Sequence, residues 1–185
     1  MDISEWAANL KSQREEKDRF FTTHWHSPVP PQEREKLKGL AYYPADPAYR
    51  FELEMHEHEE KKILRMAYTK GNERDFLRWG EFHFTIGGQK QVLQAYKSDR
   101  NEERLFILFK DSTSGKETYG GGRYIDLEPN RDLSTDGKWI LDFNKAYNPW
   151  CVYSEDYTCP LVPQENCLEV AIPAGEKVYP LEKGD

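Results

Sequence analysis

The segment EFHFTIGGQKQVLQAY, residues 81–96, constrains the fold more than any other part of the sequence. Apolar and polar residues alternate on both sides of Gly87-Gly88, as they do in half-buried strands. A two-residue Gly-Gly connection between alternating segments is typical of a β-hairpin with a primed turn. The segment therefore predicts a pair of antiparallel strands.

Further segments have the character of strands. RLFILF (104–109) is apolar on both faces, which is typical of a central strand. GRYIDLE (122–128) and KWILDFN (138–144) flank a polar loop and could form another antiparallel pair. The remaining strand-like segments are YRFELEMHEH (49–58), LRMAY (64–68) and CLEVAI (167–172). This pattern predicts a mainly β (α+β) fold whose antiparallel sheet is closed as a barrel or folded as a sandwich.

The N-terminal part has a helical pattern instead. Residues 2–21 are expected to form a surface helix that begins with a capping box of Asp2 and Glu5. PQEREKLKG (31–39) has the proline start and glycine stop of a short helix. We predict a single domain over 1–185, in which a helical lead-in (1–48) packs against a β domain (49–180).

The composition argues against a nucleic-acid-binding protein and against a membrane-spanning one. The mean hydropathy is -0.91 and the net charge is -7, and no segment is rich in Lys and Arg, which argues against nucleic-acid binding. No window approaches the roughly 18 apolar residues of a membrane span, and the N-terminus lacks the apolar core of a signal peptide. A cytoplasmic protein is expected, with 25 aromatic residues (9 Phe, 11 Tyr and 5 Trp) to build its core.

The metal-ligating residue types do not form a familiar site. Cys151, Cys159 and Cys167 are eight residues apart, whereas zinc sites place thiolates two to four residues apart in pairs. An odd number of cysteines fits a reducing compartment. His56 and His58 share a strand face with two glutamates, but that face is the polar one and a solvated surface is favoured. We expect no metal site.

The glycine-rich segment TYGGGRYIDLEPN (118–130) invites comparison with phosphate-binding loops. In SGKET, Glu117 follows Gly115-Lys116 where a Walker A motif needs Ser or Thr, and GGGRYI does not match G-x-G-x-x-G. Two interpretations remain: an anion nest with Arg123 as a clamp, or a tight sheet corner in which Arg123 pairs with a carboxylate. This segment alone favours the corner.

The polar segment 141–166 carries amides, phenols and carboxylates with few aliphatic residues. Such a segment is either a binding surface or a tightly hydrogen-bonded structural loop. If GRYIDLE pairs with KWILDFN, Arg123 lies close to Asp142 or Asn144.

FKDSTSGKETYGGGRYIDL (109–127), the segment 141–166 and IPAGEK (172–177) together resemble the bacterial and archaeal family known as domain of unknown function 1684. EKDRFF and GLAYYP are similar to its N-terminal part. The resemblance implies no activity, cofactor or catalytic residue. The family's recurring pattern includes Cys151 and Cys159 but not Trp150 or Cys167, which leaves Cys151 and Cys159 as a candidate pair.

We therefore predict a site for a small anionic molecule between the glycine turn and residues 142–166, with Arg123 as the anion anchor. Hydrolase-type chemistry is one form that this function could take, and the candidate acid/base groups are Asp111, Asp142 and Glu165. The candidate ligand-binding residues are Thr118, Tyr119, Arg123, Tyr124, Asn144, Tyr147, Asn148 and Asn166. The alternative is a non-catalytic structural or protein-interaction module without a ligand pocket. The sequence leaves the ligand, any cofactor, enzymatic activity and oligomeric state open.

Overall fold

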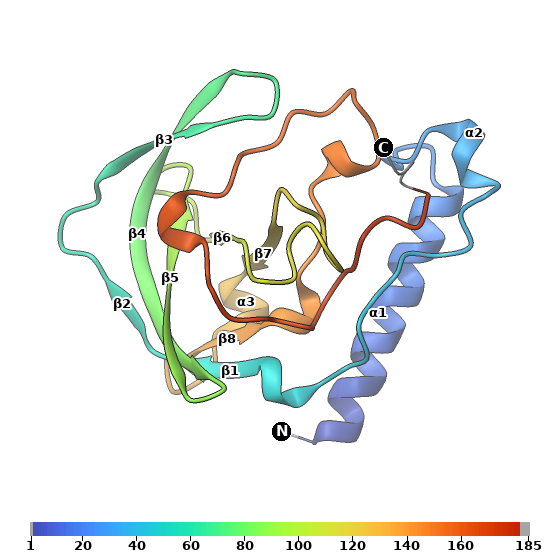
Figure 1. The fold of residues 1–185 in the computed structure, drawn as a ribbon. Helices are drawn as coiled ribbons and strands as arrows, with labels where there is room; N and C mark the ends of the chain where they lie inside the picture. The colour runs from blue at the N-terminus through green and yellow to red at the C-terminus, as the bar shows by residue number, and fades with distance from the viewer. Residues whose placement is uncertain (1, 182–185) are drawn as a thin grey trace.

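A computed structural model of the chain describes residues 2–181. Within them, one long helix and two antiparallel sheets surround a core, with long irregular segments between the sheets and the helix (Figure 1). The helices are α1 (Ile3–Thr23), α2 (Pro31–Arg34) and α3 (Pro129–Asp132), with 3-10 turns η1 (Pro47–Tyr49), η2 (Phe143–Lys145), η3 (Trp150–Val152) and η4 (Gln164–Asn166). The strands are β1 (Arg50–Leu53), β2 (Met55–Glu57), β3 (Ile63–Ala67), β4 (Glu73–Ile86), β5 (Gln89–Lys97), β6 (Leu105–Phe109), β7 (Arg123–Leu127) and β8 (Trp139–Asp142).

The larger sheet has the order β2-β4-β5-β6-β7, and β3 also pairs with β4. Its hairpin β4–β5 is the predicted one. Gly87 and Gly88 have φ angles of 56° and 79°, so both central residues of the turn are left-handed, as a primed turn requires. The two ends of the sheet, β2 and β7, do not pair with each other in the described chain. The expected antiparallel β fold is confirmed, and it is a sandwich rather than a closed barrel.

Strand β6 is the centre of the molecule, and all of its residues are buried. Leu105, Ile107 and Phe109 belong to a core cluster on one face, together with residues of β4, β5, β7 and β8. Phe106 and Leu108 belong to a second cluster on the other face. Because both faces of β6 are covered, the predicted central strand is confirmed.

The predicted pairing of GRYIDLE with KWILDFN is wrong. Strands β7 and β8 do not pair with each other: β7 pairs with β6 and β8 pairs with β1, Arg50 lying opposite Asp142. The hydrophobic pattern identified both strands, but it carries no information on which distant strand each one joins.

CLEVAI (167–172) is not a strand, although it was expected to be one. Its polar groups are used by the segment after β6 instead, with Leu168 N–H donating to the Lys110 carbonyl at 2.8 Å. Ile172 N–H donates to a carboxylate oxygen of Asp111 at 2.6 Å. Within residues 2–181, the segment forms only one isolated β-bridge, a parallel one between Lys110 and Cys167.

Helix α1 lies along the side of the molecule opposite the β4–β5 hairpin (Figure 1). The Asp2 carboxylate accepts hydrogen bonds from the N–H groups of Ser4 and Glu5 at 2.8 and 3.1 Å, which confirms the predicted helix start. Only Leu10 and Phe21 of this helix are buried. Residues 2–181 contain no helix with the length and hydropathy of a bilayer span.

Candidate functional site

The glycine turn is a tight corner that leads the chain from β6 into β7. Gly122 has a φ of +93°, which favours glycine. A Cβ on Gly122 would lie 2.5 Å from the Phe109 carbonyl oxygen and 2.6 Å from Val162 Cγ2. Its N–H donates to the Tyr119 carbonyl at 3.0 Å, so this amide is already used. Glycine is needed here because of the close approach of neighbouring chain segments.

Arg123, the predicted anion anchor, is fully buried at the start of β7. Its guanidinium lies 3.4 Å from Asp111 and donates to the Ile172 carbonyl at 2.9 Å and to the Ala174 carbonyl. Burial lowers the pKa of Arg123, and the Asp111 charge opposes that effect. The carboxylate beside Arg123 is therefore Asp111, and neither Asp142 nor Asn144 takes that place.

Two more predicted residues, Thr118 and Asn166, take part in buried hydrogen bonds. Thr113 donates to Asp111 and exchanges a hydrogen bond with Thr118, with oxygen–oxygen distances of 2.9 Å. Asn166 is fully buried, and its amide joins η4 to the sheet by donating to the Gln94 and Leu108 carbonyls at 2.9 Å. The Asn166 amide thus satisfies buried backbone groups, and the two threonine hydroxyls satisfy each other and Asp111.

The three carboxylates predicted as acid/base candidates have separate sets of partners. Asp142 accepts from the indole N–H of Trp6 at 2.8 Å, while Glu165 accepts from the Tyr96 hydroxyl at 2.5 Å. Asp111 belongs to the Arg123 network. The carboxylates thus hold different elements in place.

The other predicted ligand residues are also engaged. The Tyr124 hydroxyl donates to the Pro160 carbonyl, and the Asn148 amide donates to the Lys177 carbonyl at 2.9 Å. The Tyr119 ring covers Gly121, where a Cβ would lie 2.3 Å from a ring carbon.

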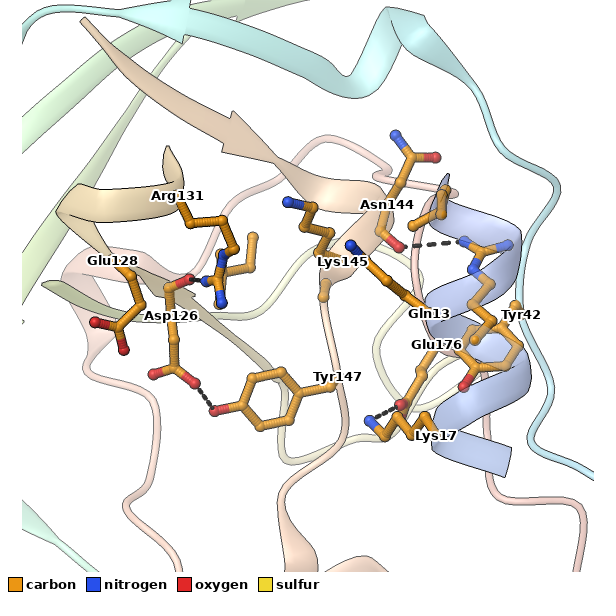
Figure 2. Close-up of a pocket in the computed structure, with 14 residues that line it drawn as sticks. Gln13, Lys17, Tyr42, Asp126, Glu128, Arg131, Asn144, Lys145, Tyr147 and Glu176 are labelled. Carbon is orange, nitrogen blue, oxygen red and sulfur yellow. Dashed lines mark hydrogen bonds and ion pairs between the residues drawn. The ribbon is translucent and has the colours of Figure 1, made fainter. Parts of the chain in front are cut away.

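A cavity of about 350 Å³ lies between α1 and the segments that follow β7 and β8. Of the predicted ligand residues, it includes Asn144 and Tyr147. Figure 2 shows Asp126, Arg131 and Tyr147 on one side of it, Lys17 and Glu176 beside α1, and Lys145 between them. The full lining is Leu10, Gln13, Arg14, Lys17, Tyr42, Ile125, Asp126, Glu128, Arg131, Asn144, Lys145, Ala146, Tyr147 and Glu176.

The carboxylate of Glu176 anchors one wall. It is buried and accepts from the Asn148 N–H at 2.9 Å, from the Tyr153 hydroxyl at 2.8 Å and from the Lys17 ammonium. Lys17 also lies 5.2 Å from the centre of the Tyr147 ring. The Lys17 charge is therefore neutralised within the protein.

Tyr147 and Asp126 form the opposite wall. The Tyr147 hydroxyl donates to Asp126 at 2.6 Å, and Arg104 donates to the other oxygen of that carboxylate at 2.9 Å. Burial raises the pKa of Tyr147, and the neighbouring Asp126 charge raises it further. Tyr147 is therefore a neutral phenol that presents its ring to the cavity.

Arg14 is held differently from the other cations. It donates to the backbone carbonyls of Tyr43 and Asn144 at 2.8 and 3.1 Å, and it stacks 4.6 Å from the centre of the Tyr42 ring. No carboxylate of the described chain forms an ion pair with it. Burial lowers the pKa of Arg14, and nearby negative groups partly offset this.

The contribution of α1 to this cavity was not predicted from the sequence. Leu10, Gln13, Arg14 and Lys17 have the spacing i, i+3, i+4, i+7, which places all of them on one helix face. The helical spacing of Arg14 and Lys17 with Leu10 was the feature of the sequence from which their role in a cavity could have been predicted. No comparable pattern in IPAGEK (172–177) indicates that Glu176 would line a cavity. Residues 2–181 bring no three His, Cys, Asp or Glu side chains together in a metal-binding arrangement.

Comparisons with known proteins identify a family and a similar solved structure. A family model with the description "Protein of unknown function (DUF1684)" matches residues 35–177, a region that begins after α1. The solution NMR structure of an uncharacterized protein from gene locus rrnAC0354 of Haloarcula marismortui is similar, with 40% sequence identity and a TM-score of 0.73. That alignment covers 98% of each chain. Among curated proteins, none matches the sequence.

Proposed function

Since this chain belongs to the DUF1684 family of proteins of unknown function, which the sequence resemblance had indicated, we propose its function from its own geometry. The protein binds a small anionic molecule in the cavity between α1 and the segments after β7 and β8. Arg14 and Lys145 are its anion contacts, and the rings of Tyr42 and Tyr147 contact its body. Arg123 is not one of the contacts, because its guanidinium is buried in the core.

The main support for this proposal is the balance of charged side chains that line the cavity. Arg14 is bonded to carbonyl oxygens, and the Lys145 ammonium lies 3.4 Å from Asp132, a carboxylate that Arg131 already approaches at 2.7 Å. Of the four cationic side chains of the lining, Arg14 thus has no ion-pair partner within residues 2–181, and Lys145 shares its partner with Arg131. A carboxylate or phosphate group would provide such a partner, and arginine binds such groups in a bidentate manner.

The size and composition of the cavity support a small molecule. Its volume of about 350 Å³ falls at the lower end of the roughly 300–1,000 Å³ of typical small-molecule sites. Leu10, Ile125 and Ala146 add apolar surface next to the charged groups. A compact anion with an aromatic or aliphatic body fits this combination.

The proposed function is binding, and no reaction is assigned to it. The acid/base candidates Asp111, Asp142 and Glu165 are not part of the cavity lining. A hydrolase function would need a carboxylate near the bound molecule, and Glu128 is the lining carboxylate that accepts no side-chain hydrogen bond within residues 2–181.

Native mass spectrometry of the purified protein tests the proposal, since a retained anion adds a discrete mass that denaturation removes. Thermal unfolding with benzoate and phenyl phosphate as probes provides the second measurement. We expect at least one probe to raise the melting temperature. Lys145→Gln should weaken its binding by roughly 10- to 150-fold, because a hydrogen bond to a charged group contributes about 1.5–3 kcal/mol.

Lys11→Gln is the matched control, since it removes the same charge from an α1 side chain that is 79% exposed and outside the cavity. It should leave binding unchanged. If no anion is retained and neither probe stabilises the protein, the alternative of an interaction module without a ligand site is favoured. Equal effects of the two lysine variants would show that binding occurs elsewhere.

A further inference from the structure

Cys151 and Cys159 lie side by side although eight residues separate them. The Cys151 N–H donates to the Cys159 sulfur at 3.4 Å. Both side chains pack in the second core cluster, against Tyr124 and Val162. Cys159 is buried, whereas Cys151 is partly exposed.

The backbone holds each cysteine in position. The Cys159 N–H donates to the Thr69 hydroxyl at 3.2 Å, and its carbonyl accepts from the Thr69 N–H at 3.0 Å, which ties Cys159 to the end of β3. Cys151 lies in the 3-10 turn η3, where the Val152 N–H donates to the Pro149 carbonyl at 3.0 Å. The proximity of the two sulfur atoms is thus fixed by contacts on both sides.

The environment makes the two thiols chemically unequal. The hydrogen bond from the Cys151 thiol lowers the pKa of Cys159, and the N–H groups of Cys151 and Trp150 lower it further against the effect of burial. The same hydrogen bond, together with burial, raises the pKa of Cys151. Cys159 is therefore the better thiolate, and the thiolate is the form that reacts with oxidants.

We propose that Cys151 and Cys159 are a redox-active pair that closes reversibly to a disulfide when a hydroperoxide oxidises the protein. The Cys159 thiolate attacks hydrogen peroxide, the O–O bond breaks, and the departing hydroxide takes up a proton and leaves as water. The Cys151 sulfur then attacks the sulfenic acid formed on Cys159 and displaces its hydroxyl group, which leaves with the Cys151 proton as a second water.

Atoms and electrons balance in this sequence. Two thiols lose two electrons and two protons, and one hydrogen peroxide molecule gains them to become two waters. A dithiol reductant reverses the reaction by thiol–disulfide exchange. Neither cysteine lines the proposed ligand cavity, so the pair responds to oxidant whether or not an anion binds.

Peptide mapping after mild peroxide treatment tests the proposal on the intact folded protein. Cleavage after Glu155, Glu165 and Glu169 by a glutamate-specific protease puts Cys151, Cys159 and Cys167 on separate peptides, whereas trypsin leaves all three on one. We expect loss of two of the three alkylatable thiols and a cross-linked pair of peptides containing Cys151 and Cys159. Dithiothreitol should restore both thiols.

Two variants serve as controls. Cys167→Ser should form the same disulfide, and Cys151→Ser should form none and leave Cys159 as a sulfenic acid that dimedone traps. The proposal is overturned if Cys151 and Cys159 both remain alkylatable after peroxide treatment. It is equally overturned if the cross-link joins either of them to Cys167.

Discussion

Arg123 has the chemistry of an anion anchor and the surroundings of a structural side chain. Its partners, Asp111 and the carbonyls of residues 172–176, attach the last irregular segment of the chain to β7. Removal of one partner from a buried ion pair leaves the other charge uncompensated, and this is more costly than loss of an exposed pair. The surroundings therefore decide the role of the residue.

We predict that Arg123→Ala lowers the free energy of unfolding by about 3–5 kcal/mol, because Asp111 remains buried without its counter-charge. Urea denaturation measures this change. Arg65→Ala is the control: Arg65 pairs with Asp75 at 3.0 Å on the surface, and its side chain is 66% exposed. Because water screens this exposed pair, its loss should lower the stability far less than the loss of Arg123. An Arg123→Ala protein as stable as the wild type would refute the structural role.

Glu81 leads to a prediction about pH. A hydrogen bond from the Gln94 amide at 2.7 Å and another from His83 lower the pKa of Glu81 below its ordinary value of 4.5. A carboxyl group with a lower pKa in the folded state binds fewer protons than in the unfolded state. Its contribution to stability is thus present above pH 4.5 and is lost as the pH falls through the folded-state pKa.

Chemical denaturation at a series of pH values below about 5 tests this linkage. The free energy of unfolding should fall less steeply with acid in Glu81→Gln than in the wild type. Glu59→Gln, which changes an exposed carboxylate without a hydrogen bond in the described chain, should retain the wild-type slope. Parallel curves for Glu81→Gln and the wild type would contradict the prediction.

At the scale of elements, the glycine turn between β6 and β7 and the turn between β4 and β5 place different demands on glycine. Gly87 has a positive φ and open space around a Cβ, whereas Gly122 has a positive φ and the Phe109 carbonyl and Val162 in close approach. The first turn therefore needs only the left-handed conformation. The second needs that conformation and the absence of a side chain.

We predict that Gly87→Ala costs about 1–2 kcal/mol through backbone strain. Gly122→Ala should cost about 1–3 kcal/mol more, because the added methyl group overpacks the corner. Thermal or urea unfolding of the two variants gives the comparison. Equal losses of stability would mean that the chain around Gly122 moves aside at no cost.

Helix α1 is joined to the rest of the chain by several polar contacts. Trp6 reaches Asp142, Arg14 reaches two carbonyls, and Lys17 reaches Glu176. The same face of the helix supplies Leu10, Gln13, Arg14 and Lys17 to the cavity. The attachment of α1 and the proposed binding of an anion therefore depend on overlapping residues.

For the molecule as a whole, local patterns in the sequence predicted local structure. The Gly87-Gly88 hairpin, the buried strand β6 and the Asp2 helix cap each depend on residues close together in the chain, and all were predicted correctly. The pairing of β7 and β8 was predicted wrongly, because the choice of partner depends on distant strands. The strand predicted at CLEVAI (167–172) is absent for a related reason. The backbone groups of this segment form hydrogen bonds with the distant segment after β6.

The predicted site, like the strand pairing, depends on contacts between distant parts of the chain. Arg123 was expected beside Asp142 or Asn144, whereas its burial beside Asp111 depends on the chain returning at residues 172–176. Asn144 and Tyr147 do line a cavity, and their neighbours there come from α1 and from Glu176. Such a cavity arises when an N-terminal helix and a C-terminal segment meet, which no local pattern encodes.

The most direct test of the proposed function is a titration of the isotope-labelled protein with phenyl phosphate, followed by NMR through its backbone amide shifts. A protein of 21.8 kDa is suited to this measurement. We predict that the shifts that change will cluster in α1 from Leu10 to Lys17 and in the segment from Lys145 to Tyr147. Changes confined to the glycine turn at 118–124, or no changes at all, would contradict the assignment of the anion site to this cavity.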